Sequence, residues 1–308
     1  MTGDPRRVVR LGTRGSALAL AQTRQIASLL CARHHDIDTR EHIIGTRGDR
    51  DRDTPLPAIG GKGVFTEDLE LALRNGEIDA AVHSLKDLPV SPAAGLCIAA
   101  IPVRVDARDA LVASVPSIEA LPPGAVVGTS SVRRAAQLRC LRHDLRVQAL
   151  RGNVETRVRK VRDGELSAVI VAAAGLLRLG LEAEIAALLP LEPFLPAPGQ
   201  GALAVQCRSD DVCIIALLAT IDDATLRAAT TAERAFLAGL GGGCSMPISA
   251  FAETTADGNR LYVRGMVCSP DGDRVLRVAA EAGLDDAGAL GHRLAEDALR
   301  LGAAQLFA

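Results

Sequence analysis

The stretch AVVGTSSVRRAAQLRCL, residues 125–141, contains a complete strand-to-helix junction. The apolar run at 125–128 predicts a buried strand. The hydroxyl groups at Thr129, Ser130 and Ser131 are suited to cap a helix that ends near residue 141. The same pattern recurs through the first two thirds of the chain, and it predicts an α/β fold with parallel strands because helices return the chain between strands.

Further strands and helix caps follow this pattern. We expect strands at 8–12, 78–84, 146–150 and 167–173, with Ser16 and Asn153 capping the helices that follow the first and third of them. Two connectors, at 101–109 and 193–201, interrupt the pattern with polar residues and with clustered Pro and Gly. They predict two lobes, with the chain crossing to the second lobe and then returning to the first.

The C-terminal part has a different pattern. Three expected strands are separated by turn sequences and followed by one helix, at 248–254, 260–268, 274–280 and 285–301. This order predicts a small α+β domain. The expected domains are therefore lobe 1 at 1–102 and 200–220, lobe 2 at 106–196, and a C-terminal domain at 222–308.

Composition excludes several classes of protein. The 308 residues carry a formal net charge of -2 and only 2% aromatic residues, which argues against a nucleic-acid partner. No apolar run is long enough to span a membrane, and residues 1–10 lack the apolar segment of a secretory signal, so we expect a cytoplasmic protein with no membrane partner.

Metal and disulfide chemistry are not expected either. The six histidines form no ligand pair of the HExxH type, and the seven cysteines include no CxxC, which predicts neither a metal site nor a disulfide framework. Cys97, Cys140, Cys207 and Cys268 are expected to be small buried hydrophobic residues.

Cys244 is different from the other cysteines. It lies in GGGCSMP, residues 241–247, where bare backbone gives large groups access to the sulfur. A thiol on such a loop is a candidate for covalent attachment of a ligand.

Three strand-to-helix junctions combine arginine with hydroxyl or amide side chains, at 13–16, 129–134 and 151–157. The beginning of a helix has free N–H groups and a partial positive charge, so Arg133 and Arg134 in a first turn are each unfavourable by roughly 0.3–1 kcal/mol. An anion bound there would offset this. Ordinary surface arginine is the alternative for each junction taken alone. The segment GGKGV at 60–64 lacks P-loop spacing, which favours a carboxylate over a nucleotide phosphate.

Asp87 is the candidate acid. It lies in HSLKDLP, residues 83–89, directly after an apolar strand, and Lys86 beside it favours the ionised carboxylate. Such a group can stabilise a developing cation or move a proton. The alternative is an aspartate that serves only the turn before Pro89. The polar segment 45–64 is long for a connector and is expected to form a lid.

These motifs in this order resemble the porphobilinogen deaminase family, also called hydroxymethylbilane synthase. The resemblance extends from about residue 9 to the C-terminal helix, and it rests on the segments TRGSALA (13–19), TRGD (46–49), GGKG (60–63), HSLKD (83–87), GTSSVRR (128–134), RGNVETR (151–157), PGQG (198–201), TAER (231–234) and GGC (242–244). Two departures from the family pattern are Gly15 and Ser245, and neither removes a charged or covalent group.

The resemblance implies a fold of two lobes similar to periplasmic binding proteins, with the C-terminal domain carrying a dipyrromethane cofactor on Cys244 through a thioether. It implies a monomeric enzyme that joins four porphobilinogen units head to tail, with Asp87 and Lys86 as catalytic groups. The implied cofactor-binding residues, beside Cys244, are Ser84, Lys86, Asp87, Thr129, Ser130, Ser131, Arg133, Arg134, Arg157 and Gly175. The implied substrate-binding residues are Arg14, Ser16, Arg151, Arg157, Arg178 and Gln200, and Lys62 and Phe65 belong to the lid.

The competing hypothesis is a non-catalytic, two-lobed protein that binds or senses a small carboxylate. It accounts for the arginine-bearing junctions and the two connectors. It gives no role to Cys244, Asp87 or the C-terminal domain.

Overall fold

The computed structural model describes residues 7–50, 63–91, 93–242 and 246–306. Two compact units emerge: Met1–Val103 with Ala202–Ala224, and Arg104–Gly201 with Thr225–Ala308. The first unit contains one five-stranded sheet, and the second contains a five-stranded and a three-stranded sheet. The division into three domains at the expected boundaries stays a prediction.

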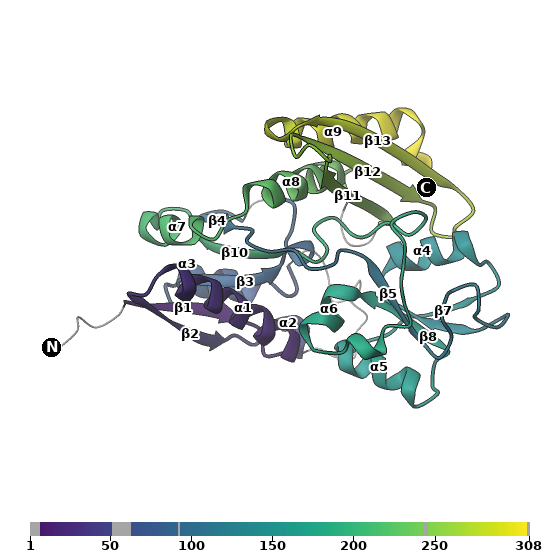
Figure 1. Ribbon diagram of the computed structural model, residues 1–308, viewed down its shortest axis with the longest axis horizontal. Helices are drawn as coiled ribbons and strands as arrows, with labels where there is room; N and C mark the ends of the chain where they lie inside the picture. The colour runs from purple at the N-terminus through teal and green to yellow at the C-terminus, as the bar shows by residue number, and fades with distance from the viewer. Residues whose placement is uncertain (1–6, 51–62, 92, 243–245, 307–308) are drawn as a thin grey trace. The chain divides into compact units, whose positions relative to one another are not determined.

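The first unit is a mixed sheet with the strand order β2-β1-β3-β10-β4. Its elements (Figure 1) are β1 (Arg7–Thr13), α1 (Ala17–Arg33), β2 (Ile37–Ile43), α2 (Arg47–Arg50), α3 (Glu67–Arg74), β3 (Ala80–Ser84), the 3-10 helix η1 (Leu85–Asp87), β4 (Leu96–Ala100), β10 (Leu203–Arg208) and α7 (Val212–Ala219). β1 runs parallel to both β2 and β3. The core between sheet and helices includes Val9, Ile26, Val82 and Val205.

The five-stranded sheet of the second unit has the order β7-β6-β8-β5-β9. Its elements are β5 (Asp109–Ala113), β6 (Val126–Gly128), α4 (Val132–Leu141), β7 (Arg146–Gln148), α5 (Val154–Arg162), β8 (Ala168–Ala172), α6 (Ala173–Arg178), η2 (Glu182–Glu184) and β9 (Ala187–Leu188). β6 runs parallel to β7 and β8. The two large sheets therefore have the same plan, with three parallel strands followed by two strands in antiparallel pairing.

The predicted helix caps are confirmed. Ser16, Ser131 and Asn153 each accept a hydrogen bond from the backbone N–H three residues further on, at the beginning of α1, α4 and α5. The pairing differs from the expected parallel arrangement at β10 and β5, which run antiparallel to their neighbours. Each of these strands directly follows a connector between the lobes, so no helix returns the chain to the same edge of the sheet before the strand begins.

The two connectors lie beside each other in both units. The N–H of Leu203 donates to the oxygen of Val103 (3.0 Å) in the first unit, and the N–H of Val105 donates to Gly201 (3.2 Å) in the second. Gly201 has φ +84°, and a Cβ added there would lie 2.6 Å from the Val105 oxygen. This close backbone approach explains why glycine is required in the PGQG segment.

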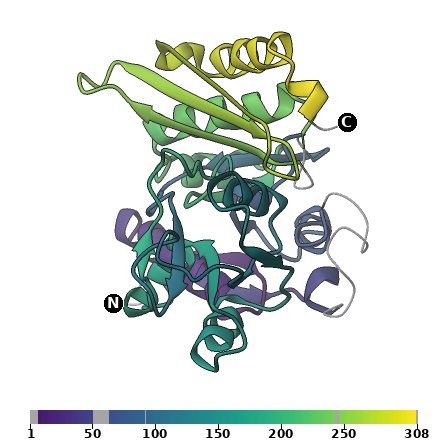
Figure 2. The same ribbon diagram turned by 90° about the vertical axis from the view of Figure 1, so that its right-hand side faces the viewer.

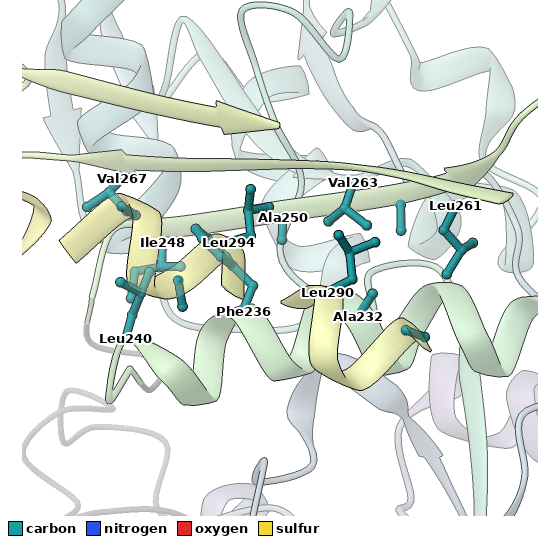
Figure 3. Packing of buried hydrophobic residues seen from close by; sticks show 14 of the residues in the cluster. Ala232, Phe236, Leu240, Ile248, Ala250, Leu261, Val263, Val267, Leu290 and Leu294 are labelled. Atoms are coloured by element: carbon teal, nitrogen blue, oxygen red, sulfur yellow. The ribbon is translucent and has the colours of Figure 1, made fainter. Parts of the chain in front are cut away.

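The three-stranded sheet carries two helices on one face. It consists of β11 (Ile248–Thr254), β12 (Arg260–Cys268) and β13 (Val275–Gly283), and is joined by α8 (Ala224–Gly239), η3 (Leu284–Asp286), α9 (Ala287–Arg300) and η4 (Ala303–Leu306). Figure 2 shows the C-terminal helix, in yellow, along this sheet. In Figure 3 Phe236 of α8 and Leu290 and Leu294 of α9 point toward strand residues such as Val263.

Gly265 makes this packing possible. A Cβ at this position of β12 would lie 2.5 Å from the ring of the fully buried Phe236. The ring therefore occupies the space that any other side chain on this face of the strand would fill.

Glu233 of α8 is a buried acid that joins distant segments of the second unit. Its side chain is 0% exposed. Oε1 accepts hydrogen bonds from Arg104 Nη1 (2.7 Å) and from the N–H of Ala252 (2.9 Å), and Oε2 accepts from the N–H of Gly199 (2.6 Å). Both carboxylate oxygens therefore accept hydrogen bonds, and the donors belong to the two connectors and to β11.

We predict that Glu233→Gln lowers the free energy of unfolding by about 3 kcal/mol, because it leaves the Arg104 guanidinium, 11% exposed, without its counter-charge. Thermal and urea denaturation measure the change. The matched control is Glu253→Gln, which removes a half-exposed partner of Arg264 and should change stability by no more than about 1 kcal/mol. Equal effects of the two substitutions would contradict the assignment.

Candidate functional site

In both large sheets, the predicted site residues follow the carboxyl ends of the parallel strands. In the first unit, Arg14 follows β1 and Asp87 follows β3. In the second unit, the arginine-bearing segments follow β6, β7 and β8. Neighbouring parallel strands end at the same edge of a sheet, so each unit gathers its polar residues along one edge, where ligands bind in open α/β sheets.

The turn after β3 presents Asp87 to solvent. Leu85 and Leu88 are buried on either side of it, and the N–H of Leu85 donates to the oxygen of Ala202 (3.0 Å). These anchors leave the Asp87 side chain exposed, and no described residue forms an ion pair with it. Ser84 accepts a hydrogen bond from Gln22 Nε2 of α1 (2.8 Å), which fixes the end of the strand. Lys86 is half-buried in the same turn.

His83, just before this turn, is fully buried. Burial lowers its pKa to about 4, and the nearby positive charge of Arg14 acts in the same direction. The ring is therefore neutral at physiological pH.

Arg14 is held on two sides. Its Nη2 lies 2.5 Å from Asp49 Oδ1, and its guanidinium carbon lies 4.0 Å from the ring centroid of Phe65. Burial raises the pKa of Asp49, but hydrogen bonds from Arg14 and Thr46 more than offset this, so the pKa lies below its usual range. Phe65, predicted as a lid residue, therefore stacks on a predicted substrate-binding arginine. Ser16 faces the backbone as the cap of α1.

The hydroxyl groups before α4 bind backbone atoms. Ser130 Oγ accepts from the N–H of Leu150 (2.7 Å) and also donates to the oxygen of Leu150. Thr129 Oγ1 accepts from the N–H of Ser131 (3.3 Å), and Ser131 caps the helix. These contacts fix the junction between β6 and α4.

Arg133 and Arg134 converge on a buried acid that the sequence reasoning missed, Asp109. The carboxylate is 0% exposed, with Arg133 Nη2 at 2.8 Å from Oδ2 and Arg134 Nη2 at 2.7 Å from Oδ1. Gln200, a predicted substrate-binding residue, donates to the same Oδ1 (2.8 Å). The anion that offsets two arginines in the first turn of α4 is therefore supplied by the protein itself.

The charges in this cluster shift each other's protonation. Burial raises the pKa of Asp109, but the charges of Arg133 and Arg134 and the hydrogen bonds outweigh burial and hold it far below its usual range. Burial lowers the pKa of Arg133, and Asp109 opposes this. The sequence signal for this acid was an aspartate at the entry to the apolar run 110–113, which a scan for motifs does not single out.

Three further predicted arginines lie near the same edge of the second unit. Arg157 Nε donates to the oxygen of Gly152 (3.1 Å), and burial, followed by the charges of Arg134 and Arg151, lowers its pKa to about 10. Arg178 Nη2 donates to the oxygen of Gly201 (2.9 Å), and burial lowers its pKa to about 10. Arg151 is half-buried, and Gly175 is buried in α6.

Two predicted residues, Cys244 and Lys62, lie outside the described residues. In the sequence, Cys244 falls between the last residue of α8 and the first residue of β11. Within the described ranges, no group of three or more His, Cys, Asp and Glu side chains is arranged to hold a metal ion. None of the described helices is long and apolar enough to cross a membrane.

Two family models match the chain in succession. "Porphobilinogen deaminase, dipyromethane cofactor binding domain" matches residues 9–216, and "Porphobilinogen deaminase, C-terminal domain" matches residues 227–300. Porphobilinogen deaminases of Brevibacillus brevis and Acidothermus cellulolyticus are 46% and 49% identical to it, over 97% of this chain in both cases and over 96% and 91% of their own lengths. A third, from Roseiflexus sp., is 48% identical over 97% of this chain and 98% of its own length.

Two solved structures align with lower scores and low sequence identity. The BenM effector binding domain with benzoate aligns with a TM-score of 0.44 at 14% identity, covering 73% of this chain and 92% of that one. The periplasmic VFT2 domain of Bordetella pertussis BvgS aligns with a TM-score of 0.41 at 16% identity, covering 70% and 86%.

The matched models and the sheet topology together define a cofactor-bearing enzyme built from two mixed α/β lobes and a small α+β domain. The chain belongs to the porphobilinogen deaminase family. This membership confirms the resemblance drawn from the motifs, and it does not favour a non-catalytic binding protein.

We predict that Asp109→Asn lowers the free energy of unfolding at pH 7 by about 3–5 kcal/mol, because two buried guanidiniums lose their counter-charge. The native pKa of Asp109 is depressed, so its contribution is present above the unfolded-state value of about 3.9 and is lost as the pH falls below it toward the native value. Wild type should therefore lose stability more steeply than Asp109→Asn as the pH falls from about 5 to about 2. Parallel urea titrations measure this.

The control for acidification is Asp163→Asn, which changes an exposed aspartate of the same unit. It should follow the wild-type pH dependence. If Asp109→Asn also followed it, the buried ion pair would not determine the acid sensitivity.

Proposed function

We propose that this protein joins four porphobilinogen molecules head to tail into linear hydroxymethylbilane, releasing ammonia at each step. The observation that carries the proposal is the match of both family models, in order, along nearly the whole chain. The exposed Asp87 and the arginine-bearing junctions supply residues suited to this chemistry.

The residues of the second unit fit a dipyrromethane, whose acetate and propionate groups are anionic. Arg157 and Arg178 are partly buried guanidiniums with lowered pKa values, and carboxylates would stabilise their charged forms. Arg133 Nε is buried without a hydrogen-bond acceptor among the described residues. When bound, the dipyrromethane supplies the pyrrole carbon to which the first substrate is joined.

The remaining assignments follow the family motifs. Cys244 would hold the cofactor through a thioether, and Lys62 and Phe65 would belong to the lid. Thr129, Ser130, Ser131, Arg133, Arg134, Arg157, Gly175, Ser84 and Lys86 would hold the cofactor. Arg14, Ser16, Arg151, Arg157, Arg178 and Gln200 would bind substrate carboxylates.

Asp87 would act on the reacting pyrrole. As ammonia leaves porphobilinogen, positive charge develops on the ring, and a fixed carboxylate next to the ring nitrogen lowers the energy of that state. Exposure matters here, because a carboxylate already paired within the protein could not serve an incoming cation. Lys86 in the same turn would help to orient substrate carboxylates.

The net charge of -2 and the low aromatic content favour small-molecule partners over nucleic acid. A cytoplasmic location, a monomeric state and the absence of membrane partners stay predictions.

We predict that purified active protein weighs more than its sequence by two porphobilinogen units less their ammonia, because Cys244 carries the dipyrromethane. Intact-mass spectrometry measures the increment, and an aldehyde reagent for pyrroles should give colour. Cys244→Ser should abolish both signals, whereas Cys213→Ser, which changes an exposed cysteine on α7, should keep both. Active protein of unmodified mass would exclude the covalent cofactor.

We predict that Asp87→Asn lowers the single-turnover rate of cofactor-loaded protein by about 10²–10³, because it removes the charge and keeps the shape. Its thermal midpoint should stay near that of wild type, since the side chain is exposed. If Asp87 only served the turn before Pro89, the variant would retain activity within tenfold of wild type. The matched control is Asp210→Asn, another exposed aspartate of the same unit.

A further inference from the structure

Cys97 and Cys207, 110 positions apart in sequence, face each other across two strands of the first unit. They are directly opposite in the antiparallel pairing of β4 with β10. Their sulfur atoms lie 3.8 Å apart. Cys207 is fully buried, whereas Cys97 is only half-buried, so Cys97 is the more accessible residue of the pair.

The backbone places this pair at a distance that a disulfide can span. The N–H of Ser209 donates to the oxygen of Gly95 (3.0 Å), and these residues are two positions along the same register. In antiparallel sheets hydrogen-bonded pairs alternate with non-bonded ones, so Cys97 and Cys207 form a hydrogen-bonded pair with Cα atoms about 5.5 Å apart. Disulfides span Cα distances of roughly 4.4–6.8 Å.

A disulfide between Cys97 and Cys207 can form only with some strain. Opposed Cβ atoms on neighbouring strands lie about 4.5–5.5 Å apart, whereas the Cβ atoms of a disulfide lie about 3.8 Å apart. Forming the bond must draw the two strands together slightly. A disulfide under such strain is more easily reduced than a relaxed one.

We propose that Cys97 and Cys207 form a redox-active dithiol that oxidises reversibly to a cross-strand disulfide, a modification site separate from the cofactor-bearing Cys244. The oxidant is a small disulfide, RSSR. Cys97 loses its proton to solvent and attacks RSSR, forming a mixed disulfide and releasing RS⁻. Cys207 then loses its proton, attacks the Cys97 sulfur and releases the second RS⁻. The two cysteines lose two electrons in total, and RSSR is reduced to two RSH.

The environment decides which thiol acts first. Burial raises the pKa of the Cys207 thiol to about 12, and the neighbouring Cys97 acts in the same direction. Cys207 is therefore a poor first nucleophile and is shielded from a bulky oxidant. Once Cys97 carries the mixed disulfide, Cys207 is already beside the sulfur that it must attack.

The test uses the folded, cofactor-loaded protein and 2,2′-dithiodipyridine as RSSR. The reaction of Cys97 and Cys207 should release two equivalents of thiopyridone in total. Neither cysteine should retain a thiopyridyl group. A peptide map without reduction should join the Cys97 and Cys207 peptides, with a loss of two hydrogens that dithiothreitol reverses. The exposed Cys213 should instead retain a thiopyridyl adduct and release one equivalent.

Two variants make the result specific. In Cys207→Ala, Cys97 should retain a stable adduct, because the second thiol is missing. In Cys213→Ser, the link between Cys97 and Cys207 should be unchanged. A retained adduct on Cys97 in the wild type, or a Cys97 that fails to react in folded protein, would overturn the proposal.

A second pair of cysteines provides an internal comparison. Cys140 of α4 packs against the cluster of the second unit that contains Cys268. A map that showed only a link between these two, with Cys97 and Cys207 left as thiols, would also overturn the proposal.

Discussion

The second unit depends on one buried carboxylate, Asp109, held between two consecutive guanidiniums. Three charged side chains removed from water are strongly unfavourable unless each has partners in good geometry. Here the geometry is fixed from several directions, because Arg134 Nε and Nη2 both donate to Oδ1 and Arg133 Nη1 donates to the oxygen of Leu195. The beginning of α4, the start of β5 and the connector at Gln200 are thereby held together.

The same cluster retains an excess of positive charge. One carboxylate neutralises one of the two guanidiniums, and the N-terminal end of α4 adds its partial positive charge. Arg157 lies close enough to contribute, because after burial the charges of Arg134 and Arg151 both lower its pKa. The edge of the sheet is therefore rigid and still attractive to anions.

The local features of the fold could be predicted from the sequence, and the long-range pairings could not. Ser16, Ser131 and Asn153 cap helices because capping involves only residues three positions apart. Asp109 meets its arginines across 24 or 25 positions, and only the sheet order brings β5 beside β8 and near α4. Likewise, nothing in residues 203–208 indicated that β10 runs antiparallel to its neighbours. Residue types do not encode the direction in which a strand crosses its sheet.

The candidate site shows the same division. The sequence singled out arginines and hydroxyl residues at junctions because these residue types recur next to apolar runs. It could not distinguish arginines that are neutralised internally from those that face a ligand, since that depends on partners far away in the chain. Asp49 and Asp109 could be assigned to Arg14, Arg133 and Arg134 only from the structure.

Whether an arginine is already paired with a protein carboxylate affects how strongly it can bind a ligand anion. A guanidinium already paired with a carboxylate gains less from a second anion than one whose charge is opposed only by burial and by like charges. Arg157 is of the second kind, with burial, Arg134 and Arg151 all lowering its pKa. A ligand carboxylate beside Arg157 would relieve all three effects at once, so the free energy of binding there includes the removal of repulsion as well as the new contact. On electrostatic grounds Arg157 is therefore the strongest candidate among the arginines proposed to bind carboxylates, whereas Arg133 and Arg134 also fix the geometry of the sheet edge through Asp109.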